Sequence, residues 1–254
     1  MQDKKKNNLL ISSLFFIYFI IGFTIYQDYG IGIEEHFHRQ NGFYWLQKIL
    51  SLLKIDTLSF LALEKYQEIR NYNPELPNPK FFNFYGVVFD VPAAFLEIIF
   101  KLNDSKLYFE IRHLLNFIFF FISSIFFYKI LKKRFKDKII IFLGTIFYII
   151  NPRIFGDSFH NNKDVLFLSI LTISIYFLFK FFEKQKIKNI ILFSLFASIA
   201  TSSRIMGVYL PLLLIIFIFT EYLSKKILIK MFLKQVSLLV FFFIFFLYLH
   251  YPYM

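Results

Sequence analysis

The chain alternates between long apolar runs and short polar stretches. A helix needs about 20 mostly apolar residues to cross the hydrocarbon core of a membrane, and most of these runs approach that length. The pattern predicts an all-α fold, a polytopic membrane helical bundle with about seven spans. We place them at residues 9–26, 111–130, 139–150 (with an extension toward 155), 164–182, 189–200, 208–223 and 232–249.

The one long polar interval, residues 28–110, is predicted to be an outer loop with helices of its own. Residues 54–69 and 84–101 repeat apolar positions at helical spacing, which is typical of amphipathic helices lying along a membrane face. Between them, residues 71–80 contain three prolines and are expected to be extended or turning. We treat residues 1–254 as one transmembrane domain.

Composition strengthens the membrane interpretation. Hydrophobic residues make up 57% of the 254 positions, including 40 phenylalanines, and charged residues only 18%. A soluble domain of this size could not bury so much apolar surface. The chain has no cysteine, which excludes disulfides and thiolate chemistry.

The placement of the basic residues predicts an orientation. The formal net charge is +12, and lysine-rich clusters lie at residues 4–6, 132–138, 183–188 and 224–234. By the positive-inside rule these clusters face the cytoplasm, so residues 28–110, 151–164, 201–207 and 251–254 face the other side of a bacterial inner membrane. We interpret residues 9–26 as a retained span, because no small-residue cleavage site follows. Short basic flanks do not form the continuous basic face that nucleic-acid binding needs.

The remaining ionisable residues gather at span ends on the predicted outer side. They are Glu34 and Glu35 after the first span, Arg112 and His113 at the second, Arg153, Asp157, His160, Lys163 and Asp164 between the third and fourth, and Arg204 between the fifth and sixth. Each alone is consistent with an ordinary interfacial charge. Together, carboxylates suited to general-base work and cations suited to binding phosphate indicate a lipid-linked phosphosugar as substrate.

Four stretches carry a resemblance to a known family. They are YGIGIEEHFHRQNG (29–42), YFEIRHLLN (108–116), NPRIFGDSFHNNKD (151–164) and SSRIMG (202–207). In this order, the chain resembles GT-C glycosyltransferases of the group that includes protein O-mannosyltransferases and lipid A aminoarabinose transferase. Relatives carry further spans, so the chain resembles their N-terminal half. The resemblance implies truncation at the C-terminus, either as a split gene, in which a partner chain supplies the missing spans, or as a fragment of a longer reading frame.

The resemblance implies an activity and roles for residues. A sugar would pass from a polyprenyl-phosphate donor to a lipid, glycan or protein acceptor on the outer face, in one inverting displacement. Glu34 or Glu35 would be the base, with Asp157 or Asp164 as a second acidic position. Arg153, Lys163 and Arg204 would bind the donor phosphate, and Arg112 and His113 would line the same cavity. No cofactor is implied.

Two alternatives remain open from the residues alone. Glu34, Glu35, His36 and His38 could together bind a metal ion, although the two histidines share a face only on an extended segment; pairing of the histidines with carboxylates or water is the more ordinary interpretation. The chain could also be a non-catalytic transporter, flippase or assembly subunit. Transporters, however, place ionisable residues near the bilayer midplane, whereas these residues cluster at one mouth.

Overall fold

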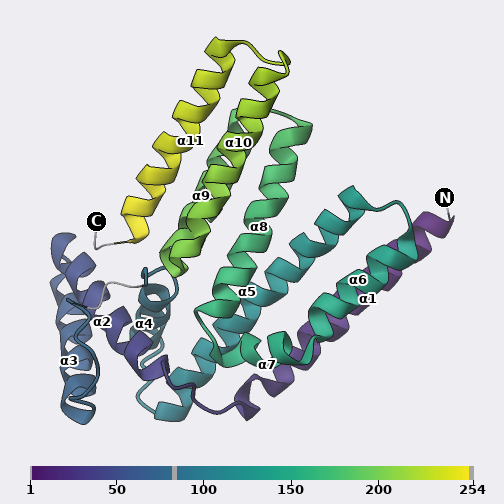
Figure 1. The fold of residues 1–254 in the computed structure, drawn as a ribbon. Coiled ribbons are helices and arrows are strands. Elements are labelled where there is room, and N and C mark those ends of the chain that lie inside the picture. Colours follow the sequence, from purple (N-terminus) through teal and green to yellow (C-terminus); the bar gives the residue numbers. More distant parts are fainter. Residues whose placement is uncertain (1, 82–84, 252–254) are drawn as a thin grey trace.

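The computed structural model describes residues 2–81 and 85–251, with residues 2–8 described by their backbone alone, and within these ranges it is all-helical. Residue 84 of one predicted amphipathic helix and residues 252–254 of the last predicted outer segment lie outside the described residues. Figure 1 shows the long helices α8, α9, α10 and α11 side by side, α5, α1 and α6 diverging from them, and a separate group formed by α2, α3 and α4.

Five helical segments are long and apolar enough to cross a membrane within the described part of the chain. They include α1 (Gln2–Ile25) with the 3₁₀ turn Tyr26–Asp28, α5 (Ser105–Arg134), α8 (Asp164–Glu183), α10 (Tyr209–Leu223) with the 3₁₀ turn Ile205–Val208, and α11 (Ile229–His250). A bent pair, α6 (Lys138–Ile150) and α7 (Pro152–His160), would make a sixth span, and α9 (Ile187–Ser203) is a shorter apolar helix. The membrane bundle is therefore confirmed, whereas the count of seven spans is not.

The bend between α6 and α7 follows from the sequence Asn151-Pro152. Proline cannot continue a preceding helix, but it fits the first turn of a new one. The Asn151 side chain accepts a hydrogen bond from the Ile154 amide (3.2 Å) and so caps α7, which leaves α6 at an angle of 51°. The helix predicted at residues 139–150 thus continues past residue 155 only as a second helix at an angle to the first, and this second helix occupies most of the predicted outer segment 151–164.

Helix α2 (Glu35–Leu52) was not predicted, because its first turns are rich in ionisable and polar residues. It packs with α3 (Asp56–Tyr72) and α4 (Asp90–Ile99) around a small apolar core that includes Phe43, Leu46 and Ile69. Helix α3 confirms the predicted helix at 54–69, and α4 covers only part of the one predicted at 84–101. We name α2, α3 and α4, together with the α5 end that contacts them, the outer cluster.

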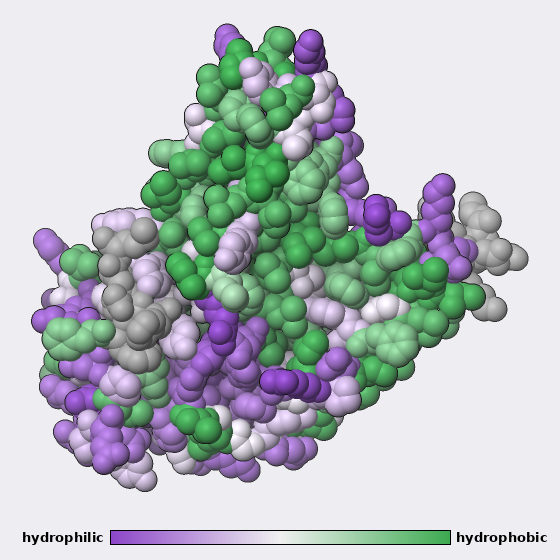
Figure 2. Space-filling view, in the orientation of Figure 1, coloured by the Kyte–Doolittle hydropathy of each residue, from purple (hydrophilic) through white to green (hydrophobic). Residues whose placement is uncertain are grey.

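The outer cluster adjoins the bundle at the helix ends that carry the four motifs. The Gly86 amide donates to the Ser202 carbonyl at the end of α9 (2.7 Å), and the Val87 amide donates to the His250 carbonyl at the end of α11 (3.1 Å). Hydrophilic residues gather over this part of the molecule, whereas the helices above it are hydrophobic (Figure 2). The fold thus brings the predicted outer segments to one end of the bundle.

Candidate functional site

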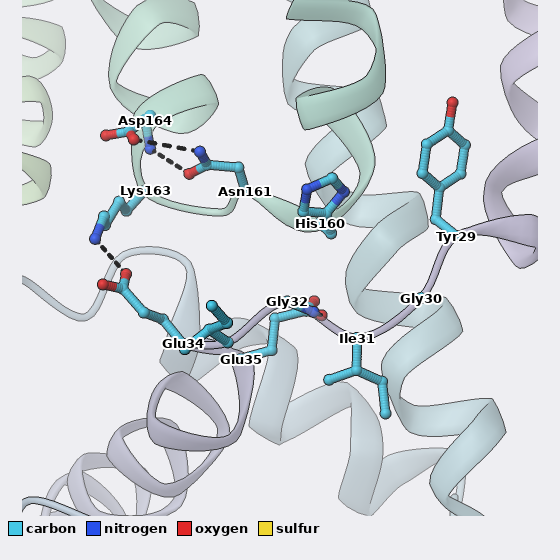
Figure 3. A pocket seen from close by; sticks show the side chains of 11 residues that line it. Tyr29, Gly30, Ile31, Gly32, Glu34, Glu35, His160, Asn161, Lys163 and Asp164 are labelled. Atoms are coloured by element: carbon cyan, nitrogen blue, oxygen red, sulfur yellow. Dashed lines mark hydrogen bonds and ion pairs between the residues drawn. The ribbon is translucent and has the colours of Figure 1, made fainter. Parts of the chain in front are cut away.

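A cavity of about 570 Å³ lies between the segment after α1 and the turn that joins α7 to α8 (Figure 3). Two segments about 130 positions apart in the sequence form it. Its lining consists of residues 29–35 together with His160, Asn161, Lys163 and Asp164. The sequence therefore correctly placed Glu34, Glu35, Lys163 and Asp164 near one another.

Glu34 presents its carboxylate to this cavity. The side chain is 49% exposed and forms an ion pair with Lys163, whose ammonium also donates to the Tyr85 hydroxyl (3.3 Å). Burial lowers the pKa of Lys163, but the hydrogen bonds to Glu34 and Tyr85 and the charge of Glu34 outweigh it, so the pKa of Lys163 is raised. Lys163 is therefore a permanent cation beside the Glu34 carboxylate.

Glu35 occupies a different environment although it is the next residue. Because α2 begins here, consecutive side chains point about 100° apart, and that of Glu35 turns inward. It is 4% exposed, accepts a hydrogen bond from the Gly32 amide (2.6 Å) and lies 3.1 Å from Nε2 of His113. Glu35 thus ties the cavity segment to α5, whereas Glu34 remains open to a ligand.

A buried histidine–aspartate pair lies behind Glu34. Nδ1 of His38 is 3.0 Å from Oδ2 of Asp90, and Nε2 of His38 is 4.0 Å from Oε2 of Glu34. Asn41 donates a further hydrogen bond to Asp90 (2.7 Å). Gly42 permits this approach of α2 to α4, because a Cβ there would lie 2.3 Å from the Asp90 carbonyl oxygen. In space, the His38 imidazole therefore lies between the carboxylates of Glu34 and Asp90.

Arg112 lies in the interior of the outer cluster and does not line the cavity. It is 2% exposed, and its Nη2 lies 3.9 Å from Oε2 of Glu97. Arg39 donates to both oxygens of the same carboxylate, from Nη2 to Oε1 at 2.5 Å and from Nε to Oε2 at 3.1 Å. His113 is likewise buried and reaches the cavity only through Glu35. Arg112 and His113 therefore do not belong to the described lining of the cavity, because both side chains are buried against carboxylates on neighbouring helices.

Asp164 and Arg204 meet at the other side of the cavity. They form an ion pair, and Asn161 donates a side-chain hydrogen bond to Asp164 (3.2 Å) while accepting one from its amide (2.9 Å). Both charged side chains are partly exposed, at 45% for Asp164 and 36% for Arg204. Arg204 thus joins the candidate site by direct contact with a lining residue.

Asp157 and Arg153 lie on α7, and neither belongs to the described lining of the cavity. Oδ1 of Asp157 is 3.7 Å from Nε2 of His160, a lining residue, and Asn116 donates to the Asp157 carbonyl (3.4 Å). Arg153 is exposed. Asp157 therefore reaches the cavity only through His160, and Arg153 shows no contact with its described lining.

Arg39, Asp90 and Glu97 were not predicted as parts of this region, because charges in a polar interval resemble surface charges, and His38 was named only as a possible metal ligand or as a partner of carboxylates or water. One signal was available: Asp90 and Glu97 are seven positions apart on α4 and so share a helix face. The helical path of α2 also separates the two histidines, because His36 packs edge-on against Phe109 while His38 faces Asp90. Within residues 2–81 and 85–251, no three histidine, aspartate or glutamate side chains gather as a metal site would require.

Comparison with known proteins gives one family assignment. No curated protein and no solved structure shows a significant match to the chain. The model of one family matches residues 91–250, well over half of the chain, and covers α4 to α11 but not Glu34 or Glu35. The chain is thus an integral membrane protein and belongs to the dolichyl-phosphate-mannose-protein mannosyltransferase family, of GT-C type.

Proposed function

We propose that this protein transfers a sugar from a polyprenyl-phosphate donor to a hydroxyl of a lipid, glycan or protein acceptor. The observation that carries the proposal is the half-exposed Glu34 carboxylate beside Lys163 at a cavity of about 570 Å³. Membership of the dolichyl-phosphate-mannose-protein mannosyltransferase family supports a polyprenyl-phosphate-linked sugar as the donor class. From the distribution of lysines, the reaction would take place at the outer face of a bacterial inner membrane, with the N-terminus in the cytoplasm.

Glu34 is the better candidate for the base of the two glutamates. The acceptor hydroxyl gives its proton to the Glu34 carboxylate while its oxygen bonds to the anomeric carbon of the donor. The bond between that carbon and the phosphate oxygen breaks, and its electron pair leaves on the phosphate. Glu35 is a positioning residue in this scheme, because its buried carboxylate is occupied by His113 and the Gly32 amide.

The leaving phosphate requires cations, and the cavity supplies two. Lys163 lines it, and Arg204 contacts its lining residue Asp164. Each cation is paired with a carboxylate, so both are already held at the site where a phosphate would bind. Arg153 and Asp157 would have a role only at the edge of this site.

His38 and Asp90 would support the base from behind. Asp90 orients the imidazole through Nδ1, which leaves Nε2 directed toward Glu34. In this position His38 can hold the Glu34 side chain and accept its proton after transfer. Because His38 does not contact the cavity, we assign it a positioning role.

The test is transfer of label from a panel of polyprenyl-phospho-sugars into membranes that contain the protein. Glu34→Gln is expected to lower transfer by about 100-fold to 10,000-fold, the usual contribution of a general base. Glu64→Gln, an exposed carboxylate on α3, is the matched control and should retain activity. Full activity in a folded Glu34→Gln variant, or no transfer by the wild type from any donor, would refute the proposal.

A further inference from the structure

A second cavity of about 570 Å³ lies within the outer cluster, between α2, α3 and the first turn of α5. Its lining includes Ile31, His36, Glu68, Tyr72, Asn73 and Tyr108. The volume falls in the range of pockets that bind small organic ligands. The proposed transfer reaction leaves this cavity without a role.

The two cavities share a wall. Ile31 lines both of them, and in Figure 3 its side chain points away from His160 and Asn161. His36, on the second cavity, follows directly after Glu34 and Glu35 in the sequence, which line the first. A ligand in the second cavity therefore lies next to the segment that carries the proposed base.

The charges around the second cavity disfavour an anionic ligand. Arg39 is committed to Glu97, and one face of its guanidinium lies over the Tyr108 ring at 3.7 Å. The carboxylate of Glu68 is 58% exposed, and its cation partner Lys65, 3.0 Å away, does not line the cavity. Burial lowers the pKa of His36, with Glu35 opposing and Arg39 adding to the effect, so the imidazole is neutral at neutral pH. Among the described residues that line this cavity, a phosphate would meet the Glu68 carboxylate and no unpaired cation.

The available groups suit hydroxyls. Within the described part of the chain, the hydroxyls of Tyr72, Ser105 and Tyr108 and the side-chain amide of Asn73 have no hydrogen-bond partner. Each can donate and accept, and Glu68 adds a strong acceptor. Tyr72 is 83% exposed, so its ring provides an unoccupied apolar face at the rim. An aromatic face beside hydroxyl, amide and carboxylate groups is an arrangement that suits a sugar ring.

We propose that this second cavity binds an uncharged sugar unit of the acceptor and so presents the acceptor hydroxyl to the neighbouring site. The assignment of that sugar to the acceptor rests on the proposed function, whereas the binding of a sugar does not.

The experiment is saturation-transfer NMR on the full chain in lipid nanodiscs, titrated with the methyl glycosides of glucose, galactose and mannose. At least one neutral glycoside should bind, and glucose 6-phosphate should bind more weakly. Tyr72→Ala should weaken the glycoside by about fivefold through loss of the ring face. Glu68→Gln should weaken it by about tenfold, the usual effect of losing a hydrogen bond to a charged group. Glu64→Gln on the same helix should leave the dissociation constant unchanged.

The base variant separates this inference from the transfer reaction. Glu34→Gln should bind the glycoside with the wild-type dissociation constant, because Glu34 does not line the second cavity. Absence of binding for all three glycosides would overturn the inference. Equal binding by wild type, Tyr72→Ala and Glu68→Gln would also overturn it, since the sugar would then occupy another site.

Discussion

The outer cluster and the helical bundle bury their polar groups in opposite ways. In the outer cluster, Glu35, Arg39 and Glu97 are at most 5% exposed, and each pairs with a residue more than 50 positions away. In the bundle, the buried polar groups are mostly serine and threonine hydroxyls. Several of these, such as Ser124 and Thr201, donate to a carbonyl of their own helix.

The two kinds of buried polar group differ in how far they define the packing of neighbouring helices. A hydroxyl that bonds within its own helix has the same partner wherever that helix packs, so it does little to define the neighbours. A buried charge is costly unless its partner is correctly placed, so the ion pairs of the outer cluster are expected to fix how α2, α4 and α5 meet. The cavity at Glu34 lies at the edge of this constrained region.

Removing the charge of Glu97 should lower the stability of the protein more than any other substitution considered below. Glu97→Gln leaves Arg39 and Arg112 buried without their shared carboxylate, and we expect a loss of about 3–5 kcal/mol in the free energy of unfolding. Unfolding in mixed micelles with increasing SDS, followed by circular dichroism, measures this value. Glu64→Gln is the matched control, and an equal effect of both variants would mean that the buried cluster contributes no particular stability.

Disturbing a close steric contact between α1 and α5 should have an intermediate effect on the free energy of unfolding. A Cβ at Gly22 of α1 would lie 2.0 Å from Cζ of Phe117, which is fully buried on α5 and stacked on Phe159. Gly22→Ala should therefore cost about 1–3 kcal/mol by overpacking, in the same unfolding measurement. Gly156→Ala on α7 has open space around its Cβ and should be neutral or stabilising. The reverse order would show that α1 does not pack on α5 in this way.

The smallest effect is expected within the bundle. Ser124→Ala removes a buried hydroxyl whose bond is to the Phe121 carbonyl of the same helix (2.7 Å). Because that carbonyl retains its helical hydrogen bond, the free energy of unfolding should change by less than about 1 kcal/mol. A loss as large as that of Glu97→Gln would remove the distinction between the two regions.

The helices of the bundle were predictable from the sequence, because their formation, like the hydrogen bonds of their hydroxyls, depends on the helix itself and not on its neighbours. Apolar runs give α1, α5, α8, α10 and α11 directly, because a membrane helix depends on its own composition. The outer cluster was only partly predictable. Helix α3 shows an amphipathic pattern, but the first turns of α2 bury Arg39, Gln40 and Asn41, which a hydropathy pattern assigns to solvent.

The candidate site was likewise predictable only in part. The sequence correctly predicted that Glu34, Lys163 and Asp164 converge, since all three lie at helix ends on one side of the bundle. It did not predict that Arg112 is buried, because the partner carboxylate Glu97 comes from a helix whose packing only tertiary structure defines. The pairing of His38 with Asp90 was anticipated only in general terms, as a histidine near a carboxylate.

The central claim is that residues 29–35 and the turn before α8 form one cavity. The chain has no native cysteine, so Glu34→Cys combined with Lys163→Cys can be tested with a short bifunctional methanethiosulfonate reagent. The two side chains are in direct contact, and we predict efficient intramolecular cross-linking in membranes. Glu34→Cys with Lys225→Cys, at the connection between α10 and α11, should not cross-link. Failure of the first pair, with both cysteines individually reactive, would contradict the account.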